Sequence, residues 1–362
     1  MIHTATLTYS PTKELFQSFI MAQGVRYDPR TKHFILDKYK GNGIVLFAFE
    51  TIKQTYRSYA LLCRINFKRL VETDDRIATF AESDTDAVAA SFDALMAEIN
   101  PDMPPFFAWN VNRIDYCVNV RTPYVAEYLR LLRKSDMPHY FQARNGNHYQ
   151  RSGSLYLVCD SVTVNIYDKQ DQLRNERKSN AAITDSIIAQ AQNILRVEVQ
   201  CHRARTSYLK LKYEMSAKTI GYFLCDEIST QVLVSTLDRI APHADYQRRG
   251  TALLYINVSR FSERKKRQLR QLIADIARQH ASIWKVRKQY DNDGIMTKNT
   301  FNQCLRALKS MNVNAVTISD NRKLIGKTLS EGLPSLQDVL LDAIAHEIDT
   351  DADNLELELD EN

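Results

Sequence analysis

Two carboxylates, a tyrosine and a lysine stand in three short segments whose apolar and polar residues alternate. The segments are Val111 to Val120 (VNRIDYCVNV), Ser161 to Lys169 (SVTVNIYDK) and Ile194 to His202 (ILRVEVQCH). A period of two is typical of a β-strand with one buried face. If the three strands share a sheet, one face collects Arg113, Asp115, Asn119, Thr163, Asn165, Tyr167, Lys169, Arg196, Glu198, Gln200 and His202.

Tyr167 is the residue on this face that can act as a nucleophile. A tyrosine hydroxyl is protonated at neutral pH, and a nearby cation or divalent metal favours the phenolate. Attack of that oxygen on a phosphodiester gives a covalent phosphotyrosyl intermediate. Asp115 and Glu198 supply hard carboxylate oxygens suited to Mg²⁺ or Mn²⁺, so we expect one of these metals to polarise the phosphate.

Each of these residues also has an ordinary structural role. A tyrosine in a strand usually packs against its neighbours, and Arg-x-Asp or Arg-x-Glu is usually an ion pair on a sheet surface. Arg113 and Arg196 can therefore simply neutralise the two carboxylates. The combination of residue types is what favours chemistry, and in that interpretation Lys169 and Arg113 join Tyr167 as candidate catalytic residues.

The charge of the chain favours a polyanionic partner. The formal net charge is +5, but the last sixteen residues contain eight acids and no Lys or Arg. Residues 1–346 therefore carry 48 basic and 35 acidic groups, a net of +13. Such an excess indicates nucleic acid as a partner. We expect the acidic tail, residues 347–362, to be disordered or else to fold back on the basic body and screen weak nucleic-acid contacts.

Two basic regions are candidates for phosphate contact. One follows the third strand, and the other is an amphipathic helix predicted over residues 262–290, whose alternative role is a solvated face on a core helix. A helix over residues 297–311 follows a polar turn, which suggests a helix-turn-helix unit. The predicted DNA-binding residues are Arg196, Arg203, Arg205, Lys210, Lys265, Lys266, Arg267 and Arg270.

Strands alternate with helices in the first part of the chain, and helices dominate the rest. This order predicts an α+β fold, with a split β-α-β catalytic domain over residues 1–215 and a mostly helical DNA-binding domain over residues 216–346. A helix over residues 85–99 ends before Pro101, because proline cannot continue a helix. The further predicted strands cover residues 4–9, 43–49, 59–67 and 155–159.

The three strand motifs together resemble a known family. NRIDYCVNV, VNIYDKQDQL and LRVEVQCHRARTSYLK look like the R-x-D, Y-x-K and R-x-E strands of the replication initiators of filamentous phages, the gene II and gene X family, and of rolling-circle plasmids. The resemblance covers roughly residues 105–215. It implies an antiparallel-sheet catalytic domain of the split β-α-β type found in the HUH and RRM folds.

The resemblance also implies a function. Members of this family nick one strand at a double-strand origin, stay joined to the 5′ phosphate through tyrosine, leave a 3′ hydroxyl as primer and later rejoin the strand. Carried over by motif, the tyrosine is Tyr167, its lysine is Lys169, and the acidic positions are Asp115 and Glu198. The expected partners are origin DNA, as duplex and single strand, with a host helicase and polymerase.

One departure concerns the metal. The larger class of tyrosine nickases uses a His-hydrophobe-His motif, and none of the eight histidines here has that spacing. Either the carboxylates hold the metal with help from one histidine, for which His202 is the best candidate, or the site works differently. His139 and His148 flank the loop before the tyrosine strand and are further candidates.

Alternatives remain for the nucleophile and for the function. Tyr149 and Tyr156, just upstream, are rivals of Tyr167. A non-catalytic protein that holds single-stranded nucleic acid on its sheet is the second functional hypothesis, since Tyr and Arg stack on bases. A tyrosine recombinase is a third hypothesis. It is disfavoured because Tyr167 lies on a mid-chain strand rather than near the end of a helical catalytic domain.

Composition limits the setting. No run of about 18 apolar residues occurs, and the amino terminus lacks the order of a signal peptide, so we expect a cytoplasmic protein with no membrane partner. The six scattered cysteines form no CxxC pair and are expected to be free thiols. A homodimer is left open.

Overall fold

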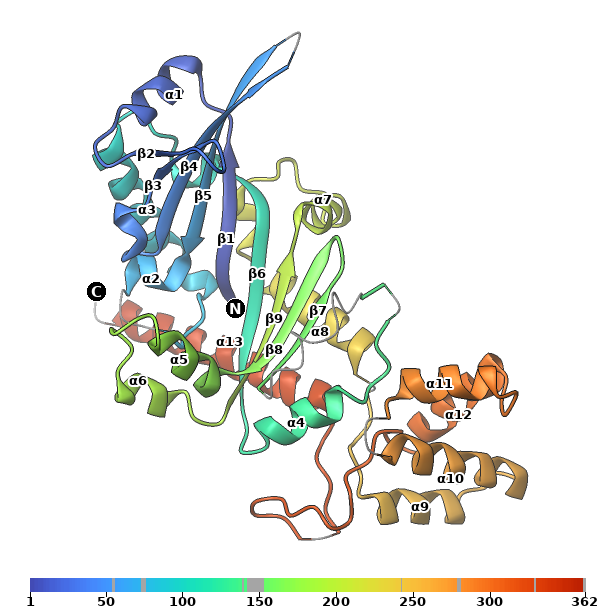
Figure 1. Cartoon of the computed structure of the whole chain (residues 1–362). Helices are drawn as coiled ribbons and strands as arrows, with labels where there is room; N and C mark the ends of the chain where they lie inside the picture. Colours follow the sequence, from blue (N-terminus) through green and yellow to red (C-terminus); the bar gives the residue numbers. More distant parts are fainter. Residues whose placement is uncertain are drawn as a thin grey trace.

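Strands from the whole first part of the chain pair into one sheet. The computed structural model describes residues 1–53, 56–72, 76–138, 140–141, 153–241, 243–278, 281–328 and 330–360, with side chains as far as residue 348. The sheet has nine strands in the order β2-β3-β4-β5-β1-β6-β9-β8-β7, and neighbouring strands are antiparallel (Figure 1). The predicted α+β class is confirmed. The strands are β1 (Ile2–Tyr9), β2 (Arg26–Asp28), β3 (His33–Leu36), β4 (Ile44–Ile52), β5 (Arg57–Asn66), β6 (Asn110–Arg121), β7 (Ser154–Val158), β8 (Val162–Asp168) and β9 (Ile194–Cys201).

The sheet consists of two halves that meet at the β1–β6 pair. In each half the first strand is followed in the chain by a helix and then by antiparallel strands, β2–β3–β4 in the first half and β7–β8 in the second, and the last strand returns to pair beside the first. β5 therefore lies between β1 and β4, and β9 lies between β6 and β8. Because β5 and β9 are antiparallel to both neighbours, β1 runs parallel to β4, and β6 runs parallel to β8.

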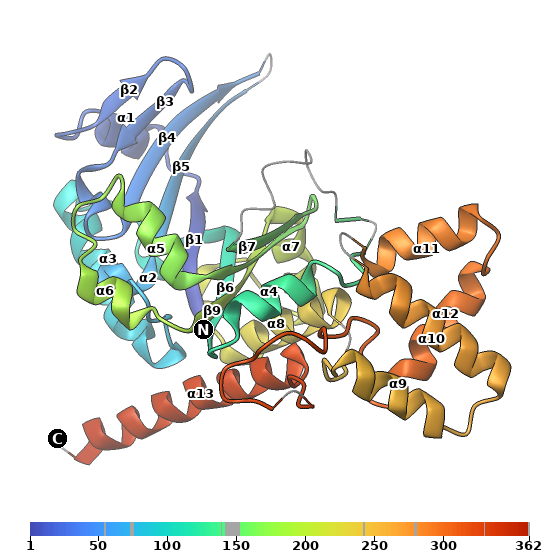
Figure 2. The same cartoon turned by 60° about the horizontal axis from the view of Figure 1, so that its bottom comes forward.

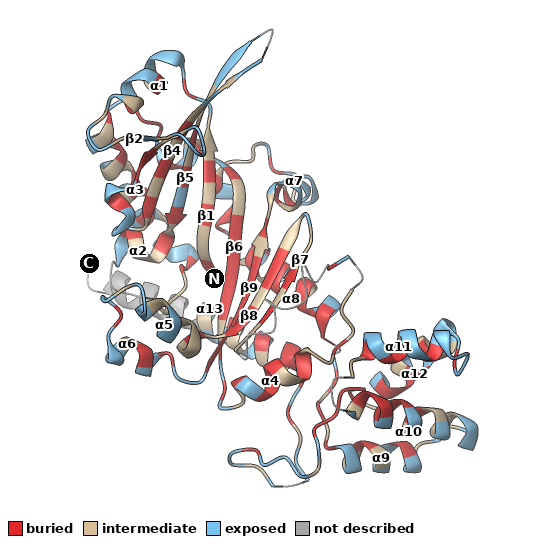
Figure 3. Ribbon diagram, viewed as in Figure 1, coloured by how far each residue is buried: buried red, intermediate tan, exposed pale blue. Residues whose placement is uncertain are grey.

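One face of the sheet is apolar and is covered by helices. Buried and partly buried residues alternate along β1 and β4, as a strand with one covered face requires (Figure 3). The buried positions belong to one continuous hydrophobic core that extends into the covering helices. Helices that pack against this sheet are α1 (Lys13–Ile20), α2 (Phe67–Val71), α4 (Val125–Leu132), α7 (Arg203–Lys212), α8 (Asp226–Ile240) and α13 (Leu336–Asp360), while α3 (Thr85–Ile99) packs on α2.

The other face is polar, and only part of it is covered. Two short helices, α5 (Lys169–Arg177) and α6 (Asp185–Gln190), carry a small apolar cluster of their own, separate from the main core. Ile77 packs against that cluster, so the segment at residues 76–78 joins the two helices over one end of the polar face. The remainder of the polar face stays partly exposed, and the strands of Figure 3 accordingly carry tan positions of intermediate burial among the buried red ones.

Four helices form a module beside the sheet: α9 (Arg249–Val258), α10 (Glu263–Ala277), α11 (Ile283–Asn292) and α12 (Lys298–Lys309) (Figure 2). The single helix predicted over residues 262–290 is wrong. Ser282 takes an extended backbone and its side chain accepts a hydrogen bond from the Lys285 amide, so a new helix starts there. Lys134, from the sheet body, donates to the carbonyls of the last turn of α10 and so stabilises that end.

The helical part of the chain divides differently from the predicted boundary at residues 215 and 216. α8 and α13 pack on the sheet, and the separate module is limited to α9 through α12. The acidic segment was predicted to be disordered, but residues 347–360 continue α13 as a helix. Glu347 lies beside the part of β6 that extends past the first residue of β1. Its carboxylate accepts hydrogen bonds from the Asn119 amide at 3.1 Å and the Thr79 hydroxyl at 2.9 Å.

Candidate active site

The sheet register brings the three predicted strands together in the order β6, β9, β8. Their polar residues share one face, as the alternation predicted, because residues directly opposite each other in adjacent strands point to the same side of the sheet. The rows across this face are Asp115–Gln200–Thr163, Cys117–Glu198–Asn165 and Asn119–Arg196–Tyr167.

The two carboxylates lie in the middle of the sheet, and both are buried. Arg113 donates to Asp115 through Nε at 2.7 Å and through a terminal nitrogen at 2.5 Å, and the Thr4 hydroxyl donates to the same carboxylate. Glu198 accepts from the Gln200 amide at 2.7 Å. Burial raises the pKa of both carboxyl groups, and the charge of Asp115 raises the pKa of Glu198 further. The two acids are therefore close enough to interact electrostatically.

Tyr167 is buried but borders a cavity. Its hydroxyl donates to Glu198 Oε2 at 3.4 Å, its exposed fraction is 7%, and it lines a cavity of about 190 Å³ that also includes His3 and Lys169. Burial raises the pKa of the phenol, and this effect exceeds the opposing effect of the Arg196 cation. The hydroxyl is therefore protonated at neutral pH, and Glu198 is the base within its reach.

Lys169 does not lie on the strand as predicted. The side chain of Asp168 accepts hydrogen bonds from two amides of the next turn, so a helix begins and Lys169 is its first residue. The lysine is buried, and its Nζ donates to Gln172 Oε1 at 3.0 Å. Burial, followed by the charge of Arg196, lowers the pKa of Lys169 to about 7. An ammonium with this pKa can give up a proton near neutral pH.

Arg196 is not a surface residue, which corrects its predicted role in DNA contact. Its side chain has an exposed fraction of 0%. Nε donates to Asn119 Oδ1 at 2.8 Å, and a terminal nitrogen donates to the Ile77 carbonyl. The segment at residues 76–78 covers it, and such a buried cation holds neighbouring groups in place instead of meeting a phosphate.

His202 follows the last residue of β9, and its hydrogen-bond partner is Thr163 instead of a carboxylate. It precedes α7, and its Nε2 lies 2.9 Å from the Thr163 hydroxyl. Burial, and then the charge of Arg113, lowers the pKa of His202. Within the described residues, no group of three or more His, Cys, Asp or Glu side chains gathers at one point. The other candidate ligands, His139 and His148, lie outside the described residues.

Asp115 and Glu198 fit Mg²⁺ or Mn²⁺ better than the predicted set with His202 does. Mg²⁺ is commonly bound by one or two carboxylates, with water and substrate phosphate completing its coordination. Burial raises the pKa of both carboxyl groups, and the Asp115 charge also raises that of Glu198; a divalent cation stabilises the charged form of such acids. Arg113 already neutralises Asp115, so Glu198 is the freer of the two donors.

His3 was not identified from the sequence. The register of β1 against β6 shifts between Ile2 and Thr4, and His3 Nδ1 lies 4.0 Å from Glu198 Oε2. Burial, and then the charge of Arg196, lowers the pKa of this imidazole well below its usual range. The only sequence signal was the alternation of Thr4, Thr6 and Thr8, which extends the polar face onto β1.

Three adjoining cavities follow the polar face, and basic side chains line them. The cavity at Tyr167 shares Asn66 and Arg69 with one of about 210 Å³, and shares Arg76 and Ala78 with one of about 660 Å³. Among the described residues that line them, Glu176 is the only acid, and it pairs with Arg76 at 3.6 Å. The basic residues are Lys40, Arg64, Lys68, Arg69, Arg76, Arg113, Arg121 and Lys169.

Most of the predicted DNA-binding residues lie elsewhere. Arg203, Arg205 and Lys210 are on α7, which packs against β6 and β9 on the helix-covered side, so they do not border the carboxylates. On α10, Lys266 and Arg270 donate to Asn257 of the neighbouring helix α9. Lys265 donates to Cys304, and Arg267 is the exposed one of the four predicted residues on α10.

A second tyrosine shares the polar face. Tyr156, on β7, pairs with Asn165 and is partly exposed, in contrast to the buried Tyr167. Its phenol contributes to the raised pKa of Arg113, which indicates that the two side chains lie near each other. Tyr149, the other rival, lies outside the described residues. Of the two rival tyrosines, Tyr156 is therefore the one that the structure supports as an alternative nucleophile.

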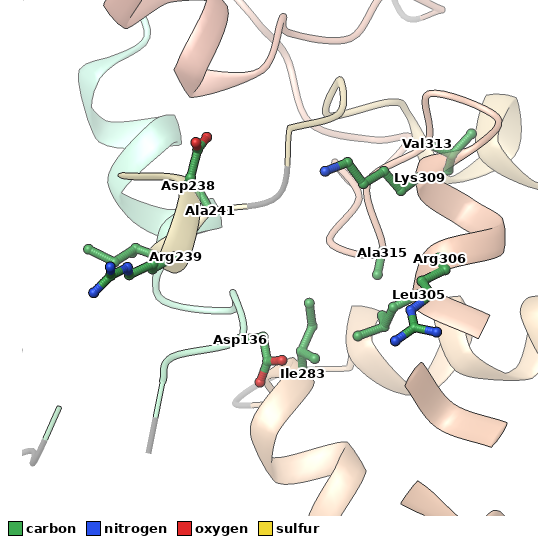
Figure 4. Close-up of a pocket in the computed structure, with 11 residues that line it drawn as sticks. Asp136, Asp238, Arg239, Ala241, Ile283, Leu305, Arg306, Lys309, Val313 and Ala315 are labelled. Atoms are coloured by element: carbon green, nitrogen blue, oxygen red, sulfur yellow. The ribbon is translucent and has the colours of Figure 1, made fainter. Parts of the chain in front are cut away.

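A separate cavity of about 240 Å³ lies where the helical module meets the sheet body (Figure 4). Asp136 and Ala241, at the end of α8, line it from the sheet body, and Ile283, Leu305 and Lys309 line it from the helical module. Asp136 also receives a bidentate ion pair from Arg287 of α11. This cavity belongs to the joint between the two parts and contains none of the predicted catalytic residues.

No protein-family model, curated protein or solved structure matches this chain. In the described part of the chain, no helix is both long and apolar enough to cross a membrane. All six cysteines are free thiols, as predicted.

Proposed function

We propose that this chain is a DNA strand-nicking and joining enzyme that initiates rolling-circle replication. The observation that carries the proposal is the convergence of Asp115, Glu198 and a tyrosine on one polar sheet face. That face is bordered by three adjoining cavities in which basic side chains predominate. Cations along a groove attract and position a nucleic-acid backbone. Tyr167 lines one of these cavities, and two acids with a phenol on one face are groups that can cleave a phosphodiester.

The proposed reaction uses Tyr167 as nucleophile. Glu198 accepts the phenol proton, the tyrosine oxygen forms a bond to phosphorus, and the bond from phosphorus to the 3′ oxygen breaks. The 3′ oxygen leaves with a proton from Lys169, whose pKa of about 7 suits the transfer. Arg113 balances charge at Asp115 and the phosphate. Mg²⁺ or Mn²⁺, held by Asp115 and by the Glu198 oxygen that does not take the proton, would supply Lewis-acid polarisation of the phosphate.

The split β-α-β topology is part of this proposal. β6 and β8 run parallel with the antiparallel β9 between them, which is the strand arrangement that such a unit needs. Helix α4 reaches β8 through β7 instead of directly, so the connection is longer. A host helicase and polymerase as partners, and a homodimer, belong to the proposal through the family resemblance only.

The test is the capture of a covalent adduct. The chain is incubated with supercoiled DNA bearing the cognate origin and Mn²⁺, and the joined peptide is identified by mass spectrometry. We expect an adduct on Tyr167 that is lost in Tyr167→Phe and retained in Tyr156→Phe, with DNA affinity unchanged in both. An adduct on Tyr156 would move the nucleophile to β7, and full activity in a chelator would remove the metal from the proposal.

A second function is favoured by the burial of Tyr167 and by the Arg113 pair that occupies Asp115. Both are features of a structural polar network, in which case the chain binds single-stranded nucleic acid without cleaving it. DNA binding with no covalent product under any metal condition would establish this second function in place of the first.

A further inference from the structure

The outer strands carry a second group of side chains on the same polar face. Phe47 and Phe49 alternate along β4 with Leu46 and Ala48, which are fully buried, so the two phenyl rings lie on the face away from the covering helices. Both phenylalanines are partly exposed and lie outside the hydrophobic core, whereas Phe34, on the opposite face, packs against it.

The rings form a row with a cation over it. The His33 ring lies 4.9 Å from that of Phe49 and 6.5 Å from that of Phe47, measured between centroids. The Arg64 guanidinium lies 4.8 Å from the centre of the Phe47 ring. Aromatic faces with an adjacent guanidinium are what unpaired bases stack on in single-strand-binding proteins, because every base presents a π-face.

The row adjoins a cavity that suits phosphates. Val45 and Arg64 border the cavity of about 210 Å³, together with Lys40, Arg69 and Arg113, and no acidic residue is among the described residues that line it. Arg113 in turn is bound to Asp115. A polynucleotide on the rings would therefore have its backbone led toward the carboxylates by positive charge.

We propose that His33, Phe47, Phe49 and Arg64 form a docking surface for single-stranded DNA, which stacks its bases on the three rings and places its phosphates in the adjoining basic cavity. The inference rests on the proposed function, which requires a single strand beside the carboxylates. It adds the place where that strand is held and the means of holding it. Base-paired DNA has no free base faces for this surface, so the single strand is the preferred form.

Binding measurements test the surface. The full chain is titrated against a fluorescein-labelled oligothymidylate of about 12 nucleotides, within the ~4–16 nucleotides that single-strand binders cover. The double variant Phe47→Leu/Phe49→Leu keeps apolar bulk but loses the rings, and we expect its affinity to fall by about tenfold or more. The matched control is Tyr27→Leu, since Tyr27 is an exposed ring on β2 that faces the other side of the same half of the sheet.

Cross-linking provides a readout that requires no variant. With oligonucleotides that carry photoreactive bromouracil, the peptide spanning residues 44–52 should be the main site of attachment. Unchanged affinity in the double variant, or attachment confined to α7 or the helical module, would overturn the proposal. Nicking with unchanged affinity would reject the surface but keep the proposed function. Reduced affinity of the double variant, together with a parent chain that forms no covalent adduct, would keep the docking surface and reject the nicking function.

Discussion

The two halves of the sheet have the same strand order but opposite chemistry. Because Thr4 of β1 pairs with Asp115 of β6, equivalent positions can be followed outward from this pair through the registers. Arg64 in the first half then corresponds to Glu198 in the second, and Phe47 corresponds to Tyr167. The remaining equivalent pairs are Asn66 with Gln200, Leu62 with Arg196, and Val45 with Asn165.

The equivalent positions differ in what their side chains can do: those of the first half can bind a polynucleotide, and those of the second can also react with it. The first half has a cation where the second has an acid, and a phenyl ring where the second has a phenol. A phenyl ring can stack on a base but cannot attack phosphorus, and an arginine can hold a phosphate but cannot accept a proton at neutral pH. The same framework therefore supports a surface for holding a strand in one half and a candidate site for cutting it in the other.

The most direct test of this difference between the halves is to neutralise the two charges at equivalent positions, Glu198 and Arg64. Glu198→Gln removes the proposed base, and we expect nicking to fall by about 100-fold or more while single-strand affinity is unchanged. Arg64→Gln, at the equivalent position, should lower affinity and reduce the salt dependence of binding by about one counterion, with turnover of bound DNA unchanged. Equal effects of both substitutions on turnover would show that binding and cleavage are not separated between the two halves of the sheet.

The second test replaces Arg196, in the second half, by leucine, the residue at the equivalent position of the first half. Arg196→Leu copies Leu62. It removes the donor to Asn119 Oδ1 and one of the two donors to the Ile77 carbonyl, which also accepts from Asn119 Nδ2 at 2.8 Å. We expect a loss of about 1–3 kcal/mol in the free energy of unfolding, measured by urea denaturation. Arg203→Leu, on the exposed surface of α7, is the control and should stay within about 0.5 kcal/mol of the parent. A loss no larger than the control's would mean that Arg196 does not hold the cover over the site.

The third prediction concerns Lys169, whose pKa is lowered to about 7 in the folded chain. Between that pH and the unfolded pKa of about 10.4, the unfolded chain binds one more proton at this lysine, so stability rises with pH. Relative to Lys169→Met, the parent should gain at most about 1.4 kcal/mol per pH unit in this window and nothing below it. Parallel stability curves for the two proteins from neutral to alkaline pH would contradict a buried, deprotonated amine.

Local patterns predicted much of the sheet and the order of its residues. The helix at Thr85–Ile99 and the strands β6 and β9 lie where alternation and proline placed them. Strands β2 and β3 were missed because runs of three and four residues carry too little periodicity. The start of a helix at Lys169 depended on a cap by Asp168 that alternation alone does not reveal.

The parts of the candidate site that could not be predicted come from distant segments. Arg196 was taken for a surface residue because nothing near it in the chain indicates that residues 76–78 cover it. His3 reaches Glu198 only because β1 inserts between two strands that are far from it in sequence. Tertiary contacts of this kind decide which polar residues are exposed, and a strand pattern cannot specify them.

Glu347 protects the part of β6 that has no β1 residue opposite it from pairing with another strand. Its carboxylate receives the Asn119 amide at a point where an additional extended segment would otherwise find a hydrogen-bonding partner. Helix α13, which carries Glu347, thus blocks this end of the sheet beside the β1–β6 pair, where the two halves meet. Another polypeptide could lengthen the sheet there only after that helix had been lifted from β6.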